Sequence, residues 1–244
     1  MIVPTVVEDA EAAARACAER IAAAIEAARA ERGVAHLALA GGSTPARTYE
    51  LLPELVREWR DVHLWLGDER CVPLDDPDSN HRLVAHALLA RLHAGTTPPI
   101  VHPIAGVGDG DPPAAAAAYE TELRAAVAAD ERSGLPVLDL ALLGLGEDGH
   151  TASLFPDDAA LEERERLVVA VRGSKPPPDR VTLTLPVLRA ARAIVVLTAG
   201  AGKADAVRAT LAGPSRNVPA SLLGEGASVE LIADRAAAAG AQAG

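Results

Sequence analysis

Short apolar segments alternate with longer helical segments along most of this 244-residue chain, and this alternation constrains the fold more than any other feature. The most apolar segments are typical of buried strands; they are Val34–Ala40, Val62–Leu66, Leu138–Leu143 and Ile194–Thr198. Strands that alternate with helices predict a parallel, doubly wound sheet flanked by helices. We therefore expect an α/β fold.

The other predicted elements complete this pattern. Helices are predicted at residues 8–32, 45–59, 81–92, 114–132 and 203–211, and further strands at 100–104, 167–171 and 181–185. The last strand alternates threonine with apolar residues, so we expect it to be half-exposed. Residues 220–223 and 228–232 are expected to form short terminal elements, and the tail beyond Ala233 is left open between helix and disorder. Because no repeat or clear linker is visible, residues 1–244 are expected to form one domain.

Composition narrows the class of protein. The net charge of −11 argues against a nucleic-acid surface, which needs a basic patch. No apolar run approaches the roughly 20 residues of a membrane span, and the first ten residues lack the pattern of a signal peptide. We therefore expect a cytoplasmic protein with no membrane or nucleic-acid partner. Aromatic residues make up 2% of the chain, so alanine, valine, leucine and isoleucine must build the core.

A glycine-rich turn follows the first apolar strand, at Gly41, Gly42, Ser43, Thr44 and Pro45. In open α/β sheets, ligands bind beyond the carboxyl ends of the strands. Glycines expose backbone N–H groups there, and the next helix adds its positive N-terminal end, so such a turn can bind phosphate. The same pattern also fits an ordinary strand-to-helix turn that Ser43 or Thr44 caps.

Three charged residues, Asp68, Glu69 and Arg70, follow the next strand. Charges at a strand end are costly to bury, so they are either solvated or have a function. Arg70 could hold an anion or an oxyanion.

A histidine lies in a second glycine-rich segment, Gly146-Glu147-Asp148-Gly149-His150. Imidazole titrates near neutral pH and can take a proton from water and return it, so His150 is a candidate general base. Asp148 is close enough in sequence to orient it. A lone histidine here would more simply be a surface or capping residue. The other histidines lack this setting and receive no role; they are His36, His63, His81, His86, His93 and His102.

Basic residues form a fourth cluster near the end of the chain. Lys175 and Arg180 flank three consecutive prolines, and Lys203 opens a predicted helix after two glycines. Arg180 and Lys203 follow turns next to predicted strands, where they could converge on an anion. The alternative is that both are solvated charges.

Several familiar motifs are excluded. The pattern Gly144-x-Gly146-x-x-Gly149 should open a helix if it bound a dinucleotide, and no helical segment follows it. Gly202-Lys203 lacks the remainder of a phosphate-binding P-loop. Neither a serine-hydrolase elbow nor a zinc-binding H-E-x-x-H motif is present.

Together with Asp78-Ser79-Asn80 and Thr151–Pro156, these clusters resemble the 6-phosphogluconolactonase branch of the glucosamine-6-phosphate isomerase/6-phosphogluconolactonase family. The matching segments keep the family order between about residues 36 and 211; they are Ala40–Pro45, Gly67–Pro73, Asp78–Asn80, Gly144–Pro156, Lys175–Thr184 and Gly200–Ala204. The resemblance implies a modified Rossmann-like fold that binds a sugar phosphate. It also implies hydrolysis of 6-phospho-D-glucono-1,5-lactone to 6-phospho-D-gluconate, a step of the oxidative pentose phosphate pathway.

Roles for single residues follow from the same resemblance. The expected phosphate-binding residues are Gly41, Gly42, Ser43, Thr44, Arg180 and Lys203. The expected catalytic residues are His150 as general base, Asp148, Arg70 and Asp68. Whether Arg70 binds the phosphate or the oxyanion is left open. We expect no cofactor, no metal and a small-molecule partner, and a monomer with a dimer as the alternative.

Two other functions remain open at this point. The first is an aminosugar-phosphate isomerase/deaminase, although that branch tends to have tyrosine where this chain has Arg70. The second is a non-catalytic sugar-phosphate-binding module, which usually carries a DNA-binding segment.

The chain also departs from the family pattern at Asp157, where a glycine is common, and this could change a turn.

Overall fold

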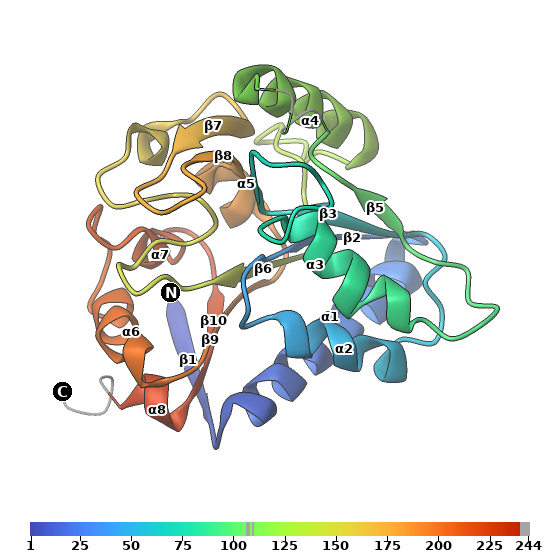
Figure 1. The fold of residues 1–244 in the computed structure, drawn as a ribbon, viewed down its shortest axis with the longest axis horizontal. Coiled ribbons are helices and arrows are strands. Elements are labelled where there is room, and N and C mark those ends of the chain that lie inside the picture. Colours follow the sequence, from blue (N-terminus) through green and yellow to red (C-terminus); the bar gives the residue numbers. More distant parts are fainter. Residues whose placement is uncertain (106–107, 109, 240–244) are drawn as a thin grey trace.

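Parallel strands form the main sheet of the computed structural model, which describes residues 1–105, 108 and 110–239 (Figure 1). Within these residues the sheet has seven strands, and each runs parallel to its neighbours. Their order across the sheet is β1 (Ile2–Val7), β10 (Val229–Asp234), β9 (Ile194–Thr198), β6 (Leu140–Gly144), β2 (Ala35–Leu39), β3 (Val62–Leu66) and β5 (Ile100–His102). The predicted α/β fold with a doubly wound, mainly parallel sheet is confirmed.

A small, separate antiparallel sheet was not predicted, although strands were predicted at residues 167–171 and 181–185, where two of its strands lie. In the described part of the chain it consists of β4 (Asp68–Arg70), β8 (Asp179–Leu183) and β7 (Val168–Arg172), in that order. The prediction that residues 181–185 are half-exposed is wrong, because all five are buried. Their threonine hydroxyls find partners in the interior: Thr182 Oγ1 accepts from the Ser153 N–H at 3.2 Å and donates to the Leu183 carbonyl at 3.1 Å.

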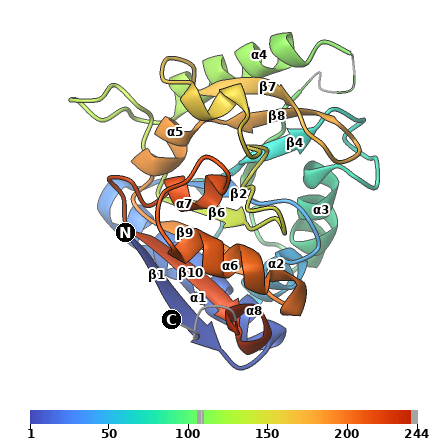
Figure 2. The ribbon, with the colours of Figure 1, turned by 90° about the vertical axis from the view of Figure 1, so that its left-hand side faces the viewer.

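Helices cover both faces of the main sheet. They are α1 (Ala10–Arg32), α2 (Ala46–Leu55), α3 (Asn80–Ala87), α4 (Pro112–Ala126), α5 (Leu185–Ala190), α6 (Ala204–Leu211), α7 (Pro219–Leu222) and α8 (Arg235–Ala238). Figures 1 and 2 place α1 and α2 on one side of this sheet, and α4 with the small sheet on the other. None of the helices in the described ranges combines the length and apolarity needed to cross a bilayer.

The first helix and first strand show what local sequence can reveal. Helix α1 begins after Asp9, whose carboxylate accepts from the Ala12 N–H at 2.8 Å, and it ends at Gly33 with φ +77°. Strand β1 was not predicted, because it is a partly exposed edge strand whose partner β10 lies at the other end of the chain. The open tail prediction falls partly on α8 and partly on residues 240–244, outside the described residues.

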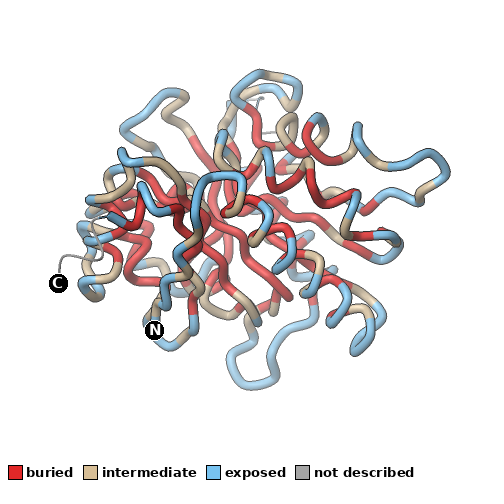
Figure 3. Tube along the Cα trace, turned by 90° about the horizontal axis from the view of Figure 1, so that it is seen from below, coloured by how far each residue is buried: buried red, intermediate tan, exposed pale blue. Residues whose placement is uncertain are grey.

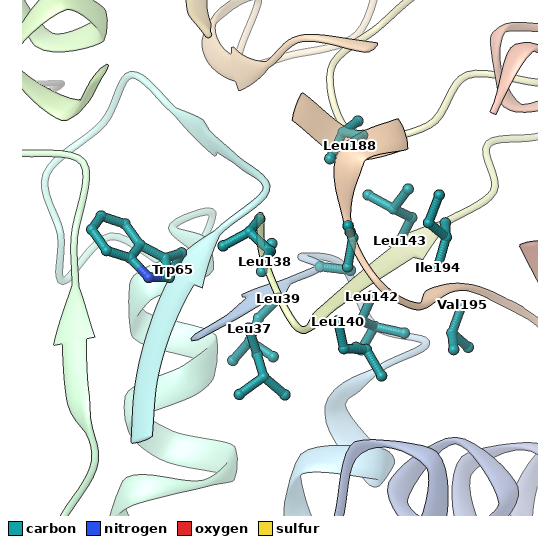
Figure 4. Packing of buried hydrophobic residues seen from close by; sticks show 14 of the residues in the cluster. Leu37, Leu39, Trp65, Leu138, Leu140, Leu142, Leu143, Leu188, Ile194 and Val195 are labelled. Atoms are coloured by element: carbon teal, nitrogen blue, oxygen red, sulfur yellow. The ribbon is translucent and has the colours of Figure 1, made fainter. Parts of the chain in front are cut away.

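Aliphatic side chains from neighbouring strands build the core between these layers. Figure 3 shows the buried segments in the centre of the molecule, and Figure 4 shows leucines of β2 and β6 beside Ile194 and Val195 of β9. The few aromatic residues are buried as well; they are Tyr49, Trp59, Trp65, Tyr119 and Phe155. Alanine, valine, leucine and isoleucine form most of the buried surface, as the composition predicts.

The direction of chain winding changes between β2 and β6. From β2 the chain continues to β3 and β5 on one side, and from β6 it continues to β9 and β10 on the other. Because β2 and β6 are neighbours, the loops that follow them diverge from a shared point at the carboxyl edge of the sheet. Such a switch point is where open α/β sheets bind ligands.

Three histidines cluster toward the β5 edge of the sheet. Trp65 Nε1 donates to His36 Nδ1 at 3.2 Å, and His63 Nδ1 lies 2.9 Å from His102 Nε2. The Glu122 carboxylate lies 2.6 Å from the other ring nitrogen of His102. Burial, and then the two neighbouring imidazoles, lower the pKa of His36 to about 4.

We expect acidification to destabilise the fold through His36. An unfolded histidine has a pKa near 6.5 and the folded one a pKa of about 4, so between these values the unfolded chain binds the proton more readily. Stability therefore falls as the pH drops below about 6.5, by roughly 3 kcal/mol at most. Urea unfolding at about pH 7 and about pH 5 measures the loss.

Two variants assign this loss to a residue. His36→Gln, whose amide oxygen can accept from Trp65, should show a smaller pH dependence than the wild type. The exposed His86→Gln serves as control and should keep the wild-type dependence. An unaltered pH dependence in His36→Gln would contradict the assignment.

Candidate active site

A cleft of about 270 Å³ lies at the carboxyl edge of the sheet, where the chain winding changes direction. Most of the residues predicted from the sequence line it; they are Gly41, Gly42, Ser43, Thr44, Asp68, Arg70, His150, Arg180 and Lys203. Asp148 is not part of the lining and contacts His150 instead. The structure thus brings together residues that are up to 162 positions apart in the chain, from Gly41 to Lys203.

The turn that follows β2, Gly41–Thr44, is called the anion loop below. Gly42 has φ +87°, a conformation that favours glycine. Gly41 has no room for a side chain, because a Cβ atom would lie 1.8 Å from the Asn80 amide oxygen. The alternative that Ser43 or Thr44 caps α2 is wrong: Pro45 precedes the helix, and no side chain caps it. The positive end of α2 therefore adjoins the anion loop without a side-chain acceptor.

Two arginines lie opposite each other on the small sheet. Arg70 of β4 pairs with Arg180 of β8, and both line the cleft. The Arg70 guanidinium donates to the Asp78 carbonyl at 2.5 Å, and Arg180 Nε donates to the Pro177 carbonyl at 2.5 Å. Burial, and then the Arg70 charge, lower the pKa of Arg180, although nearby carboxylates oppose this. An anion placed against both groups would relieve their repulsion.

Two lysines complete the positive lining. Lys203 Nζ donates to the Leu145 carbonyl at 2.9 Å, so its side chain reaches from the start of α6 to the loop after β6. Lys175 is exposed on the loop before β8 and lines the cleft as well. In the described part of the chain, none of the four cations forms an ion pair with a carboxylate. The four cations outnumber the two carboxylates of the lining, Asp68 and Glu147, and this local positive charge in a chain of net charge −11 favours an anionic ligand.

The loop after β6 holds His150 against Asp148. The carboxylate lies 2.5 Å from His150 Nδ1, and it also accepts from the His150 backbone N–H at 3.3 Å. Gly146 makes room for this pair, since a Cβ atom there would lie 2.0 Å from the imidazole. Burial opposes the charge of Asp148, but the contact with His150 and the Lys175 charge outweigh it and lower the pKa of Asp148. The carboxylate can thus hold a proton on Nδ1 and leave Nε2 free to accept one.

This loop is not a dinucleotide-binding turn. The Gly149 N–H donates to the Gly146 carbonyl at 3.0 Å, and the Gly146 N–H donates to the His150 carbonyl at 2.8 Å, which closes a tight turn. No α-helix follows it before α5, in the residues that the structure describes. Within the same residues, no three His, Cys, Asp or Glu side chains are grouped as a metal site requires.

In the charged triplet after β3, Asp68 and Glu69 are buried and Arg70 is partly buried, and the middle member has a structural role. Glu69 accepts hydrogen bonds from the Ser79 hydroxyl at 3.0 Å and from the Asn80 and His81 N–H groups at 2.8 Å each. It therefore satisfies the first N–H groups of α3. Burial raises the pKa of Glu69, and these hydrogen bonds oppose the rise. The alternative of a solvated loop is wrong here, because the triplet forms β4.

Some residues at the site were not selected from the sequence. Glu147 and Lys175 line the cleft, and Ser153 and Asn80 bond to Asp68 behind it. All four lie inside the motif segments, but spacing along a loop does not tell which side chains face a cleft.

At Asp157, where the chain departs from the family pattern, the backbone adopts φ +56°, the left-handed conformation that aspartate tolerates better than most residues.

Comparisons with known proteins show the family to which this chain belongs. The family model for glucosamine-6-phosphate isomerases/6-phosphogluconolactonase matches residues 8–232. The chain is 43% identical over 220 residues to a 6-phosphogluconolactonase of Mycobacterium tuberculosis, covering 87% of each chain. It is 40% identical over 220 residues to the 6-phosphogluconolactonase of Homo sapiens, covering 87% of this chain and 81% of the human protein.

Solved structures of known proteins share the fold of this chain. The 6-phosphogluconolactonase from Trypanosoma cruzi has a TM-score of 0.85 at 29% identity, covering 99% of this chain and 97% of the other. A monomeric glucosamine-6-phosphate deaminase has a TM-score of 0.76 at 24% identity, covering 98% and 99%, and shares the fold. The chain belongs to the glucosamine-6-phosphate isomerase/6-phosphogluconolactonase family.

Proposed function

We propose that this protein hydrolyses 6-phospho-D-glucono-1,5-lactone to 6-phospho-D-gluconate, with His150 as the general base. One observation carries the proposal: four cations that form no ion pair among the described residues line the same cleft as a histidine that an aspartate holds at 2.5 Å. The cations suit the phosphate of the substrate, and the histidine suits proton transfer at its other end. The names of the relatives described above support the same reaction.

Phosphate binding positions the substrate. In the proposed complex, the N–H groups of the anion loop, Arg180 and Lys203 hold the phosphate. The cleft already contains each of these groups, so little reordering precedes binding. The lactone carbonyl carbon, C1, is then held near His150 rather than left to find it by diffusion.

Hydrolysis then needs one proton shuttle. His150 Nε2 accepts a proton from a water molecule as the water oxygen bonds to C1. Asp148 stabilises the imidazolium that forms. As the tetrahedral intermediate collapses, the bond from C1 to the ring oxygen breaks, and the imidazolium returns the proton to that oxygen. Positive charge in the cleft stabilises the transient oxyanion; Arg70 and Lys175 are the candidates, since Arg180 and Lys203 are assigned to the phosphate.

The two other functions make different demands. An aminosugar-phosphate isomerase/deaminase would release ammonia from glucosamine 6-phosphate, whereas the proposed reaction releases none. A binding module would hold a sugar phosphate without turnover, and would not require the Asp148–His150 contact.

The experiment is a time course of lactone disappearance with purified protein, read against the spontaneous hydrolysis of the lactone. We expect saturable acceleration and no ammonia release from glucosamine 6-phosphate. Lactone decay at the spontaneous rate would refute the proposal. Ammonia release without lactone turnover would show that the protein is an isomerase/deaminase instead.

A further inference from the structure

Asp68 lines the cleft, and each oxygen of its carboxylate accepts a hydrogen bond from a neutral donor. Its side chain is 6% exposed. One carboxylate oxygen accepts from the Ser153 hydroxyl at 2.5 Å, and the other accepts from the Asn80 amide at 3.1 Å. The same amide nitrogen lies 2.8 Å from the Asp68 backbone carbonyl. These two hydrogen bonds hold both carboxylate oxygens in place, as a positioning role requires.

The two donors come from different segments behind the cleft, the loop that follows β6 and the start of α3. Ser153 lies three positions after His150 on the loop that follows β6, and its side chain is fully buried. Asn80 begins α3, and its amide packs against the anion loop in the space that a side chain on Gly41 would fill. The Asp68 carboxylate therefore connects the loop that carries His150 with the residue that packs against the anion loop.

We propose that Asp68, Asn80 and Ser153 form a buried positioning network that sets the distance between the anion loop and His150, and that Asp68 transfers no proton. The inference rests on the lactonase activity proposed above and gives Asp68 a different role from the catalytic one that the family resemblance implies. It also links four separate motif segments: Ser153 and Asn80 bond to the Asp68 carboxylate, and Gly41 packs against the Asn80 amide.

The network matters because a substrate held at its phosphate must present C1 to His150. A displacement of about 1 Å between the binding groups and the reacting groups can cost roughly 100-fold in rate. The phosphate contacts themselves are made by other residues, so loosening the network should lower kcat much more than it raises KM.

The test compares Asp68→Asn, Asp68→Ala and Ser153→Ala by kcat and KM for the phosphorylated lactone. In Asp68→Asn the amide oxygen can accept from Asn80 and the amide N–H can donate to Ser153 Oγ, so kcat should fall less than about tenfold. Asp68→Ala removes both connections and should lose roughly 100-fold. Ser153→Ala removes one and should lose roughly tenfold, with KM within about twofold of the wild type.

A role in proton transfer predicts another pattern, in which Asp68→Asn and Asp68→Ala lose kcat equally and Ser153→Ala changes little. That result would overturn the network. Ser153→Ala removes a single oxygen atom, so it keeps the test decisive if Asp68→Ala unfolds. The matched control is Thr184→Val, which removes an equally buried hydroxyl that bonds only to the backbone carbonyls of Arg166 and Leu167. It should lower thermal stability and leave kcat unchanged.

The outcomes also separate this inference from the proposed function. An inactive wild-type protein would refute the lactonase proposal itself. An active wild-type protein whose Ser153→Ala variant keeps its kcat would refute the network alone.

Discussion

His150→Ala should lower kcat for the phosphorylated lactone by roughly 10²–10⁴-fold, the range expected when a general base is removed. The imidazole lines the cleft, and its Nδ1 is held by Asp148 at 2.5 Å, so its Nε2 is the group proposed to accept the proton. KM should change little, because the phosphate contacts remain. Initial rates at saturating lactone, corrected for spontaneous hydrolysis, measure the effect.

The fold should survive this substitution. The His150 side chain is 22% exposed and makes its polar contact with one neighbour, Asp148. The exposed His93→Ala controls for loss of an imidazole elsewhere and should keep the wild-type rate. Wild-type turnover in a folded His150→Ala protein would remove this residue from the mechanism.

Arg180→Ala should raise KM for the phosphorylated lactone by roughly 10–100-fold, since a hydrogen bond to a charged group is worth about 1.5–3 kcal/mol. Arg180 is buried, lines the cleft and forms no ion pair in the described part of the chain, so its charge is available to a phosphate. Steady-state kinetics over a wide lactone range measure KM, and the constant for inhibition by inorganic phosphate should rise in parallel.

A matched arginine and a second cation make this prediction specific. Arg172→Ala removes an exposed arginine of the same small sheet that pairs with Asp179, and it should leave KM unchanged. Lys203→Ala should also raise KM. Because Lys203 is not part of the small sheet, this variant separates the loss of a positive charge from the loss of a buried side chain in that sheet. A loss confined to kcat in both variants would show that these groups do not hold the phosphate.

The main sheet could be predicted from the sequence because its central strands are apolar runs that end in glycine or charge. Val62–Leu66 and Ile194–Thr198 were predicted with the bounds that the structure shows. Strand β1 and the small sheet could not be predicted in the same way. Strand pairing there joins segments that are distant in the chain, such as Ile2 with Val229 and Arg70 with Arg180. Local composition does not predict such pairings.

The sequence predicts which loops form the site, but it does not predict most of the side-chain contacts between them. Winding order explains why the anion loop and the His150 loop meet, since both begin at the switch between β2 and β6. The engagement of Asp68 by Ser153 and Asn80 depends on side-chain directions across three segments, which spacing along the chain does not specify. Glu69 is a further case: its motif position suggested chemistry, and its contacts with the start of α3 give it a structural role.

In the proposed mechanism, one substrate molecule contacts the phosphate-binding cations and His150 at the same time. The most direct measurement compares kcat/KM of the wild-type protein for the lactone with and without its phosphate group. We predict a preference of at least about 100-fold for the phosphorylated lactone, because phosphate binding supplies the positioning of C1. Equal values for the two lactones would contradict the account, since His150 would then act without any help from the cations across the cleft.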